Sequence, residues 1–136
     1  VDMTLTMVVR RDHPLAGRTG LLASELAAYP SAAPLELPQR DMHQGGGIII
    51  ENYSVLRDVT LATDCTWMTA PAFIAAELAS GDLVQLQLAE PVRRVNEVSL
   101  IHRRGQTRSP AALAVAEEVR RLLHDICRRA DPMPNE

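Results

Sequence analysis

Apolar and polar residues form two kinds of pattern along this chain, one typical of strands and one typical of helices. Short runs rich in β-branched residues predict strands. These runs lie at 5–9, 48–50, 65–69 and 83–88. Stretches with apolar residues at three- and four-residue steps predict helices. They lie at 25–28, 55–62 and 72–79. Because strands and helices alternate, the pattern predicts an α/β layer structure with a mostly parallel sheet.

Capping and turn residues mark where these elements end. Pro14 biases His13 away from the helical conformation, so the first strand closes with a turn. Ser24 is placed to cap the first helix with its hydroxyl group. Gly81 suits the left-handed conformation that ends the third helix.

The stretch 31–47 is the least regular part of the chain, with two prolines and three consecutive glycines. It predicts a short strand, one helical turn near 39–43, and loop. The glycines precede a strand and lack the Gly-Lys-Ser/Thr ending of a phosphate loop, so a flexible connector is favoured over a phosphate cradle. The β-branched run that follows, 48–50, predicts a buried strand.

The last third of the chain carries a predicted strand over 98–102 and then a long amphipathic helix. Ser109 is a natural N-cap, and Pro110 fits the first helical position, where a missing N–H costs nothing. Apolar residues then fall on one helix face. They are Ala112, Val115, Ala116, Val119, Leu122, Leu123 and Ile126.

Charge is unevenly distributed along the chain. The formal net charge of −3 argues against nucleic-acid binding through this chain as a whole. Residues 1–92 carry five Arg and eleven acids, whereas residues 93–129 carry nine Arg and four acids. An acidic partner or an anionic ligand would suit this excess, but a solvated helix face with internal ion pairs is favoured. Arg121 lies four residues from both Glu117 and Asp125, which predicts two such pairs.

Length and cysteine content favour a single domain in a reducing compartment. A chain of 136 residues can bury a core without disulfides or metals. Cys65 and Cys127 are too few and too far apart for a disulfide framework or a zinc site. No apolar run long enough to cross a bilayer and no signal segment is visible, so we expect a cytoplasmic protein without membrane contact. A signal lying upstream of Val1 would change this expectation.

Residues for catalysis are sparse. The histidines show no paired metal-binding spacing, and the chain has no Gly-x-Ser-x-Gly elbow. We therefore predict no catalytic residue, no metal and no cofactor, and each histidine is expected at the surface or in a turn. These residues are His13, His43, His102 and His124.

A candidate ligand site lies where the strand over 48–50 meets the next helix. Asn52, Tyr53 and Ser54 occupy this junction, and ligands of open α/β sheets bind at that edge. A helix start offers free N–H groups and partial positive charge, which suits a carboxylate or a hydroxylated molecule. Asn52 or Ser54 acts either as a cap alone or as a cap that also contacts ligand, and both interpretations stay open.

The only tryptophan, Trp67, lies near the end of the strand over 65–69. Burial in the core is favoured for it over a position in the cleft. Its neighbours Thr66 and Thr69 are candidates to face the same cleft as Ser54. Together with Asn52 and Tyr53, these residues complete the predicted effector-binding set.

Five short motifs follow one another in a set order. They are MVVRRDHPLA over 7–16, LAAYP over 26–30, Pro71 with Glu77-Leu78, GDLV over 81–84 and RSPAA over 108–112. In this order, over residues 4–128, the chain resembles the effector-binding domain of LysR-type transcriptional regulators of bacteria. Residues 64–68 depart from the family's common Gly-x-Gly-Ile turn and look like the branch that governs aromatic-acid and sugar catabolism.

The resemblance implies an α/β fold like that of type 2 periplasmic binding proteins, with a small effector held between two subdomains. Residues 8–97 would form a near-complete second subdomain. Residues 1–7 and 98–128 would supply the crossover strands, the C-terminal strand and the terminal helix of the first, and residues 129–136 a tail. The family's DNA-binding helix-turn-helix, its linker helix and half of the first subdomain are absent from this sequence.

The resemblance also implies a function without catalysis. The partners expected are a small anionic or hydroxylated metabolite, further copies of the chain in a dimer or tetramer, and DNA only through the absent N-terminal domain. The alternative is a solute-binding protein of an ABC-type transporter, and a third class is a small α/β enzyme. A helix-turn-helix encoded before Val1 would favour the regulator, and a secretory signal there the transporter protein. With half a subdomain absent, the apolar face of the last helix predicts self-association.

Overall fold

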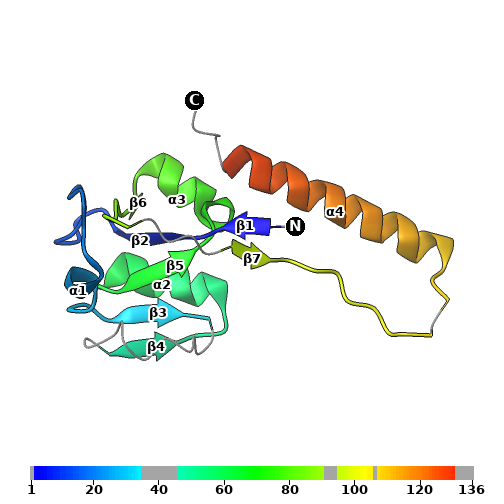
Figure 1. Cartoon of the computed structure of the whole chain (residues 1–136), viewed down its shortest axis with the longest axis horizontal. Coiled ribbons are helices and arrows are strands. Elements are labelled where there is room, and N and C mark those ends of the chain that lie inside the picture. The colour runs from blue at the N-terminus through cyan, green and yellow to red at the C-terminus, as the bar shows by residue number, and fades with distance from the viewer. Residues whose placement is uncertain (1, 35–45, 91–94, 106, 131–136) are drawn as a thin grey trace.

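The computed structural model describes residues 2–34, 46–90, 95–105 and 107–130. Most of them form one α/β body, and the C-terminal residues 98–105 and 107–130 extend from it as an arm (Figure 1). The chain runs outward along the arm in irregular structure and returns as one long helix. The body and the arm are therefore distinct parts of the molecule.

A five-stranded mixed sheet forms the centre of the body, in the order β4-β3-β5-β2-β6. Its strands are β2 (Thr6–Arg10), β3 (Ser31–Ala33), β4 (Gly47–Ile49), β5 (Thr66–Thr69) and β6 (Leu83–Gln85). β3 is parallel to β4 and β5, whereas β2 is antiparallel to both β5 and β6. The prediction of a mostly parallel sheet holds for β3, β4, β5 and β6, which run in one direction, and β2 is the exception because it enters the body from the opposite side and lies between β5 and β6.

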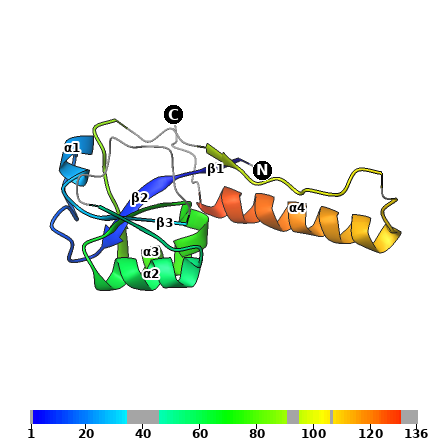
Figure 2. The same ribbon diagram turned by 90° about the horizontal axis from the view of Figure 1, so that it is seen from below.

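Helices cover both faces of this sheet (Figure 2). They are α1 (Ala23–Leu26), α2 (Tyr53–Ala62), the 3-10 helix η1 (Pro71–Ile74) and α3 (Ala75–Ser80). Side chains alternate along β2, so that Val8 packs with Leu56 and Trp67 under α2, whereas Met7 and Val9 belong to a second cluster. The core is therefore two apolar layers separated by the sheet.

One predicted helix-ending residue and one predicted helix cap of the body can be compared with the structure. Gly81 ends α3 with a φ of 75°, as expected from its freedom to adopt the left-handed region. The predicted cap Ser24 was wrong, since α1 begins at Ala23 and Ser24 lies inside its first turn. The carboxylate of Glu25 instead accepts a hydrogen bond from the backbone N–H of Leu22 at 2.9 Å.

The predicted buried strand over 48–50 is an exposed edge strand. Ile48 and Ile49 are both exposed, because β4 lies at the end of the sheet and pairs with β3 alone among the described strands. The β-branched run therefore indicated extended backbone correctly but not burial. The helical turn predicted near 39–43 lies outside the described residues.

A separate two-stranded ribbon joins the body to the arm. β1 (Asp2–Thr4) is antiparallel to β7 (Val95–Glu97), with Met3 opposite Asn96. The strand predicted over 98–102 was wrong, since those residues form no strand and the pairing lies just before them. Among the described residues, the paired register runs from Thr4 opposite Val95 to Asp2 opposite Glu97.

The terminal helix α4 (Pro110–Ala130) forms the returning half of the arm. Ser109 caps it as predicted, its Oγ accepting a hydrogen bond from the N–H of Ala112 at 3.2 Å. Its last two residues, 129 and 130, belong to the helix and not to the predicted tail. Of the predicted apolar face only Ala116 is buried. That face consequently lacks a covering surface among the residues described here.

The ion pairs of α4 differ in part from those predicted. Arg121 pairs with Asp125 at 3.2 Å, as expected for residues four apart. Its other partner is Glu118 at 2.5 Å, and Glu117 pairs with Arg120 at 2.9 Å. Pairs three residues apart thus replace the expected pair of Glu117 with Arg121, and both spacings bring side chains together on a helix.

Candidate functional site

The carboxyl ends of β3, β4 and β5 all point toward the side of the body where the arm lies (Figure 1). α2 follows β4 and η1 follows β5, so both helices begin at this edge. Ligands of open α/β sheets bind at such an edge, where helix starts and strand ends meet. The predicted site residues belong to these elements.

Asn52 fixes the start of α2. Its Oδ1 accepts hydrogen bonds from the N–H groups of Ser54 at 2.9 Å and Val55 at 3.2 Å. The cap interpretation of Asn52 is thereby confirmed, while its contact with a ligand stays a prediction. The cap holds Tyr53 and Ser54 in the first turn of the helix.

A pocket of about 240 Å³ lies between the start of α2 and η1. We call it the α2–η1 pocket; it is lined by Tyr53, Ser54, Arg57, Trp67, Phe73 and Ile74. Trp67 is 1% exposed and belongs to the core, whereas Tyr53 and Phe73 are 45% and 52% exposed. The favoured prediction for Trp67, burial in the core, is confirmed, and the residue also lines the pocket.

The three aromatic rings are arranged around Tyr53. Its ring centroid lies 6.0 Å from that of Trp67 and 5.5 Å from that of Phe73, the latter pair meeting edge to face. Tilted and edge-to-face contacts at these distances are favourable. The pocket therefore has a mainly aromatic wall contributed by three different elements.

Two buried polar atoms of β5 have no hydrogen-bond partner among the described residues: Trp67 Nε1 and Thr69 Oγ1. Both side chains lie on the same face of β5, two residues apart, under α2 and η1. Buried polar groups in native proteins are nearly always paired. An indole N–H and a hydroxyl are thus available at or next to the pocket.

The structure does not bring all predicted residues together. Thr66 points to the opposite face of β5, where its Oγ1 donates to the carbonyl oxygen of Pro30 at 3.5 Å. Thr69 shares the face of Trp67 but does not line the pocket. Tyr53, Ser54 and Trp67 are the predicted residues that meet in it, with Asn52 directly before them.

Arg57 and Phe73 were not predicted from the sequence. Arg57 lies one helical turn after Tyr53, a spacing that places both on the same face of α2. Its guanidinium is 3.1 Å from the carboxylate of Asp58 and 3.5 Å from that of Glu77 on α3. The helical spacing was a usable signal for Arg57, whereas the approach of Phe73 depends on how η1 packs.

His13 occupies a turn, as predicted, but is buried instead of exposed. Its Nδ1 accepts a hydrogen bond from the N–H of Leu15 at 3.0 Å, so the proton resides on Nε2, which donates to the carbonyl oxygen of Asp64 at 3.2 Å. Burial lowers the pKa of His13 below its ordinary value of 6.5. The residue stabilises a turn and lies apart from the α2–η1 pocket.

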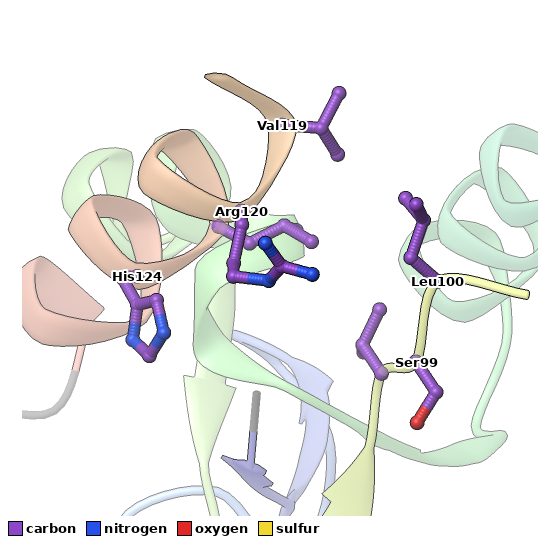
Figure 3. A pocket seen from close by; sticks show the side chains of 7 residues that line it. Ser99, Leu100, Val119, Arg120 and His124 are labelled. Atoms are coloured by element: carbon purple, nitrogen blue, oxygen red, sulfur yellow. The ribbon is translucent and has the colours of Figure 1, made fainter. Parts of the chain in front are cut away.

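A second pocket of about 200 Å³ lies within the arm, between α4 and the segment 98–100. Figure 3 shows Val119, Arg120 and His124 on α4, with Ser99 and Leu100 on the extended segment. Val98 and Leu123 complete its lining. This second pocket lies on the apolar side of α4, which is largely exposed.

Within the described ranges, no three side chains of His, Cys, Asp or Glu come close enough together to hold a metal ion. Cys65 and Cys127 are both free thiols. Among the same residues no helix has the length and apolar character needed to cross a bilayer.

The structure is therefore an α/β domain with a pocket at the carboxyl edge of its sheet. The LysR substrate binding domain model matches residues 1–124, so the chain belongs to that family. It is accordingly the effector-binding domain of a LysR-type transcriptional regulator and not an enzyme. This agrees with the resemblance read from the sequence and favours the regulator over the transporter protein.

One relative is the SDS degradation transcriptional activation protein of a Pseudomonas strain, 34% identical over 134 residues. That match covers 90% of this chain and 42% of the relative, so the chain spans less than half of the relative's length.

Two solved structures support the fold. The regulatory domain of CcmR from Synechocystis, in complex with 2-PG, is 16% identical with a TM-score of 0.60, and the match covers 99% of this chain and 66% of that one. OxyR of Corynebacterium glutamicum in its oxidized form is 15% identical with a TM-score of 0.63, covering 96% and 44%. The mixed α/β architecture is therefore that of LysR regulatory domains.

Proposed function

We propose that this domain senses a small anionic or hydroxylated metabolite in the α2–η1 pocket. The observation that carries the proposal is Trp67, which lines a pocket at the carboxyl edge of the sheet and whose buried indole N–H has no partner among the described residues. Asn52, Tyr53 and Ser54 would contact the ligand from the start of α2, and Trp67 and Thr69 from β5. Thr66 would act only through the backbone of β5, since its side chain faces away.

The same proposal assigns residue ranges to the two subdomains. Residues 8–97 would be the second subdomain, and residues 1–7 with 98–128 would belong to the first. The separation of body and arm, linked by the β1–β7 ribbon, supports this division. A ligand at the edge facing the arm would contact both subdomains and would stabilise one arrangement of them by its differential affinity.

In the intact regulator this change would alter how a DNA-binding domain, absent from this sequence, sits on a promoter. We further propose a homo-oligomer, a dimer or tetramer, supported by the exposed apolar side of α4. A cytoplasmic location is part of the proposal and is supported by the two free cysteines.

A promoter-reporter assay of the intact regulator tests the site. A panel of carboxylates, alkyl sulfates and hydroxylated compounds first identifies the inducer; alkyl sulfates are included because of the relative's part in SDS degradation. The double variant Asn52→Ala with Ser54→Ala should then lose most of the inducer response. Ser24→Ala, an exposed serine of α1, is the matched control and should respond normally. An unchanged response in the double variant would remove these residues from the site.

A further inference from the structure

The charges around the α2–η1 pocket narrow the choice between an anionic and a hydroxylated ligand. Among the described residues that line the pocket, Arg57 is the one with a charged side chain. Its guanidinium is already paired with two carboxylates, those of Asp58 and Glu77. Arg57 contributes one positive charge, whereas Asp58 and Glu77 contribute two negative charges. The net charge of this group beside the pocket is therefore negative. An incoming anion would therefore meet more repulsion than attraction.

The two carboxylates are fixed differently. Asp58 is the residue next to Arg57, and its side chain is 66% exposed, so solvent screens much of its charge. Glu77 approaches from α3, and its side chain is only 18% exposed. Its charge is screened less, which makes Glu77 the stronger contributor to the field at the pocket. Arg57 thus serves to join α2 to α3 and is not a free anion receptor.

The remaining lining offers apolar area and a hydrogen-bond donor. Tyr53 and Phe73 provide exposed aromatic surface, and the indole N–H of Trp67 is buried without a partner in the described part of the chain. An indole N–H can only donate, so its natural partner is a carbonyl or hydroxyl oxygen. Because this atom has no exposed surface, a ligand reaches it only when a neighbouring side chain turns aside. Tyr53 is half-exposed, lies next to Trp67 and belongs to the first turn of α2, so it is the side chain placed to do so.

We propose that the α2–η1 pocket selects an uncharged, ring-containing molecule whose carbonyl or hydroxyl oxygen accepts a hydrogen bond from Trp67 Nε1, and that it discriminates against the corresponding anion. Tyr53 turns aside on binding, and the ligand's ring packs against Tyr53 and Phe73. This inference rests on the proposed function, since it specifies the ligand of the same site.

Benzamide, benzoate and benzamidine test it, because they share one shape and are neutral, anionic and cationic. Each is titrated into the chain by calorimetry and by the fluorescence of Trp67, the only tryptophan. Benzamide should bind about tenfold more tightly than benzoate, a difference that one nearby like charge readily produces. It should also bind more tightly than benzamidine, which has no acceptor oxygen for the indole N–H. Benzoate binding as tightly as benzamide would overturn the inference.

A variant that removes one charge distinguishes the effect of electrostatics on ligand affinity from the effect of pocket shape. Glu77→Gln should raise benzoate affinity several-fold while leaving that of benzamide nearly unchanged. Glu118→Gln is the matched control, since Glu118 also pairs with an arginine but lies on α4. Equal effects of the two variants, or no binding of any probe, would also overturn the inference. The proposed function would fail separately, through an inducer response that survives the Asn52 and Ser54 substitutions.

Discussion

At the scale of single residues, buried polar groups define what this domain can do. Burial lowers the pKa of His13, which lies in a turn where it accepts one hydrogen bond from the N–H of Leu15 and donates one to the carbonyl oxygen of Asp64. Trp67 is equally buried but has no partner for its N–H in the described structure. The first arrangement stabilises the body, and the second leaves a donor available for a ligand.

His13 should make stability depend on pH. Its pKa is lowered in the folded state, so below about 6.5 the unfolded chain binds the proton more readily than the folded one. The free energy of unfolding should therefore fall as the pH drops below that value and be unaffected by His13 above it. Urea unfolding at a series of pH values measures this slope. It should diminish in His13→Gln and persist in His124→Gln, an exposed control.

Asn52 should contribute to stability as a cap independently of any ligand. Asn52→Ala should lower the free energy of unfolding by about 1 kcal/mol, because two N–H groups of α2 lose their acceptor. Asn52→Asp retains an acceptor oxygen and should stay near the parent value. Denaturant unfolding of the three proteins makes the comparison. Equal loss in both variants would show that the cap is not the source of the effect.

At the scale of elements, predictions from local sequence succeeded where local physics decides the outcome. Ser109 caps α4 and Gly81 ends α3 as predicted, because each acts within one helical turn. The run at 48–50 formed a strand, but its burial depended on which strands lie beside it. The predicted strand over 98–102 does not form in the described structure, where pairing with β1 involves Val95–Glu97 instead, and such pairing with a distant segment is not encoded locally.

In the candidate site, too, local features were predictable from the sequence and features that depend on tertiary packing were not. The start of α2 was predictable from Asn52 and from the end of the preceding strand, and Trp67 from its place in the next strand. Arg57 was not predicted, although its spacing of four residues from Tyr53 on the same helix was a usable signal. Phe73 had no such signal, because η1 reaches the pocket through tertiary packing. Thr66 was wrongly grouped with Trp67, although adjacent residues of a strand point to opposite faces.

The exposed apolar side of α4 should drive association of the chain. Val115 and Leu122 are both exposed on that side. We expect sedimentation to show dimers or larger species, and the double variant Val115→Glu with Leu122→Glu to shift them toward monomer. Leu22→Glu places one such charge on the exposed leucine directly before α1 and should not change the mass. A compact monomer in the unmodified chain would contradict this expectation.

At the scale of the whole molecule, one body carries the proposed sensing pocket and one arm carries the apolar helix. The pocket is lined by residues of α2, β5 and η1, all in the body. Both of these helices begin at the sheet edge that faces the arm (Figure 1). Because the chain belongs to the LysR substrate-binding family, we interpret the body and the arm as parts of an effector-binding domain. The terminal helix, which contributes one of the motifs that identify the family, does not line the α2–η1 pocket.

The central claim is that the α2–η1 pocket is where the regulator senses its effector. The most direct measurement is the inducer-dependent promoter response of the intact regulator carrying Ser54→Phe, which fills the pocket from the first turn of α2. Val55→Phe adds the same ring at the next, exposed residue outside the pocket. The account predicts that Ser54→Phe reduces the response about tenfold or more and that Val55→Phe responds like the parent. A normal response from Ser54→Phe would contradict it.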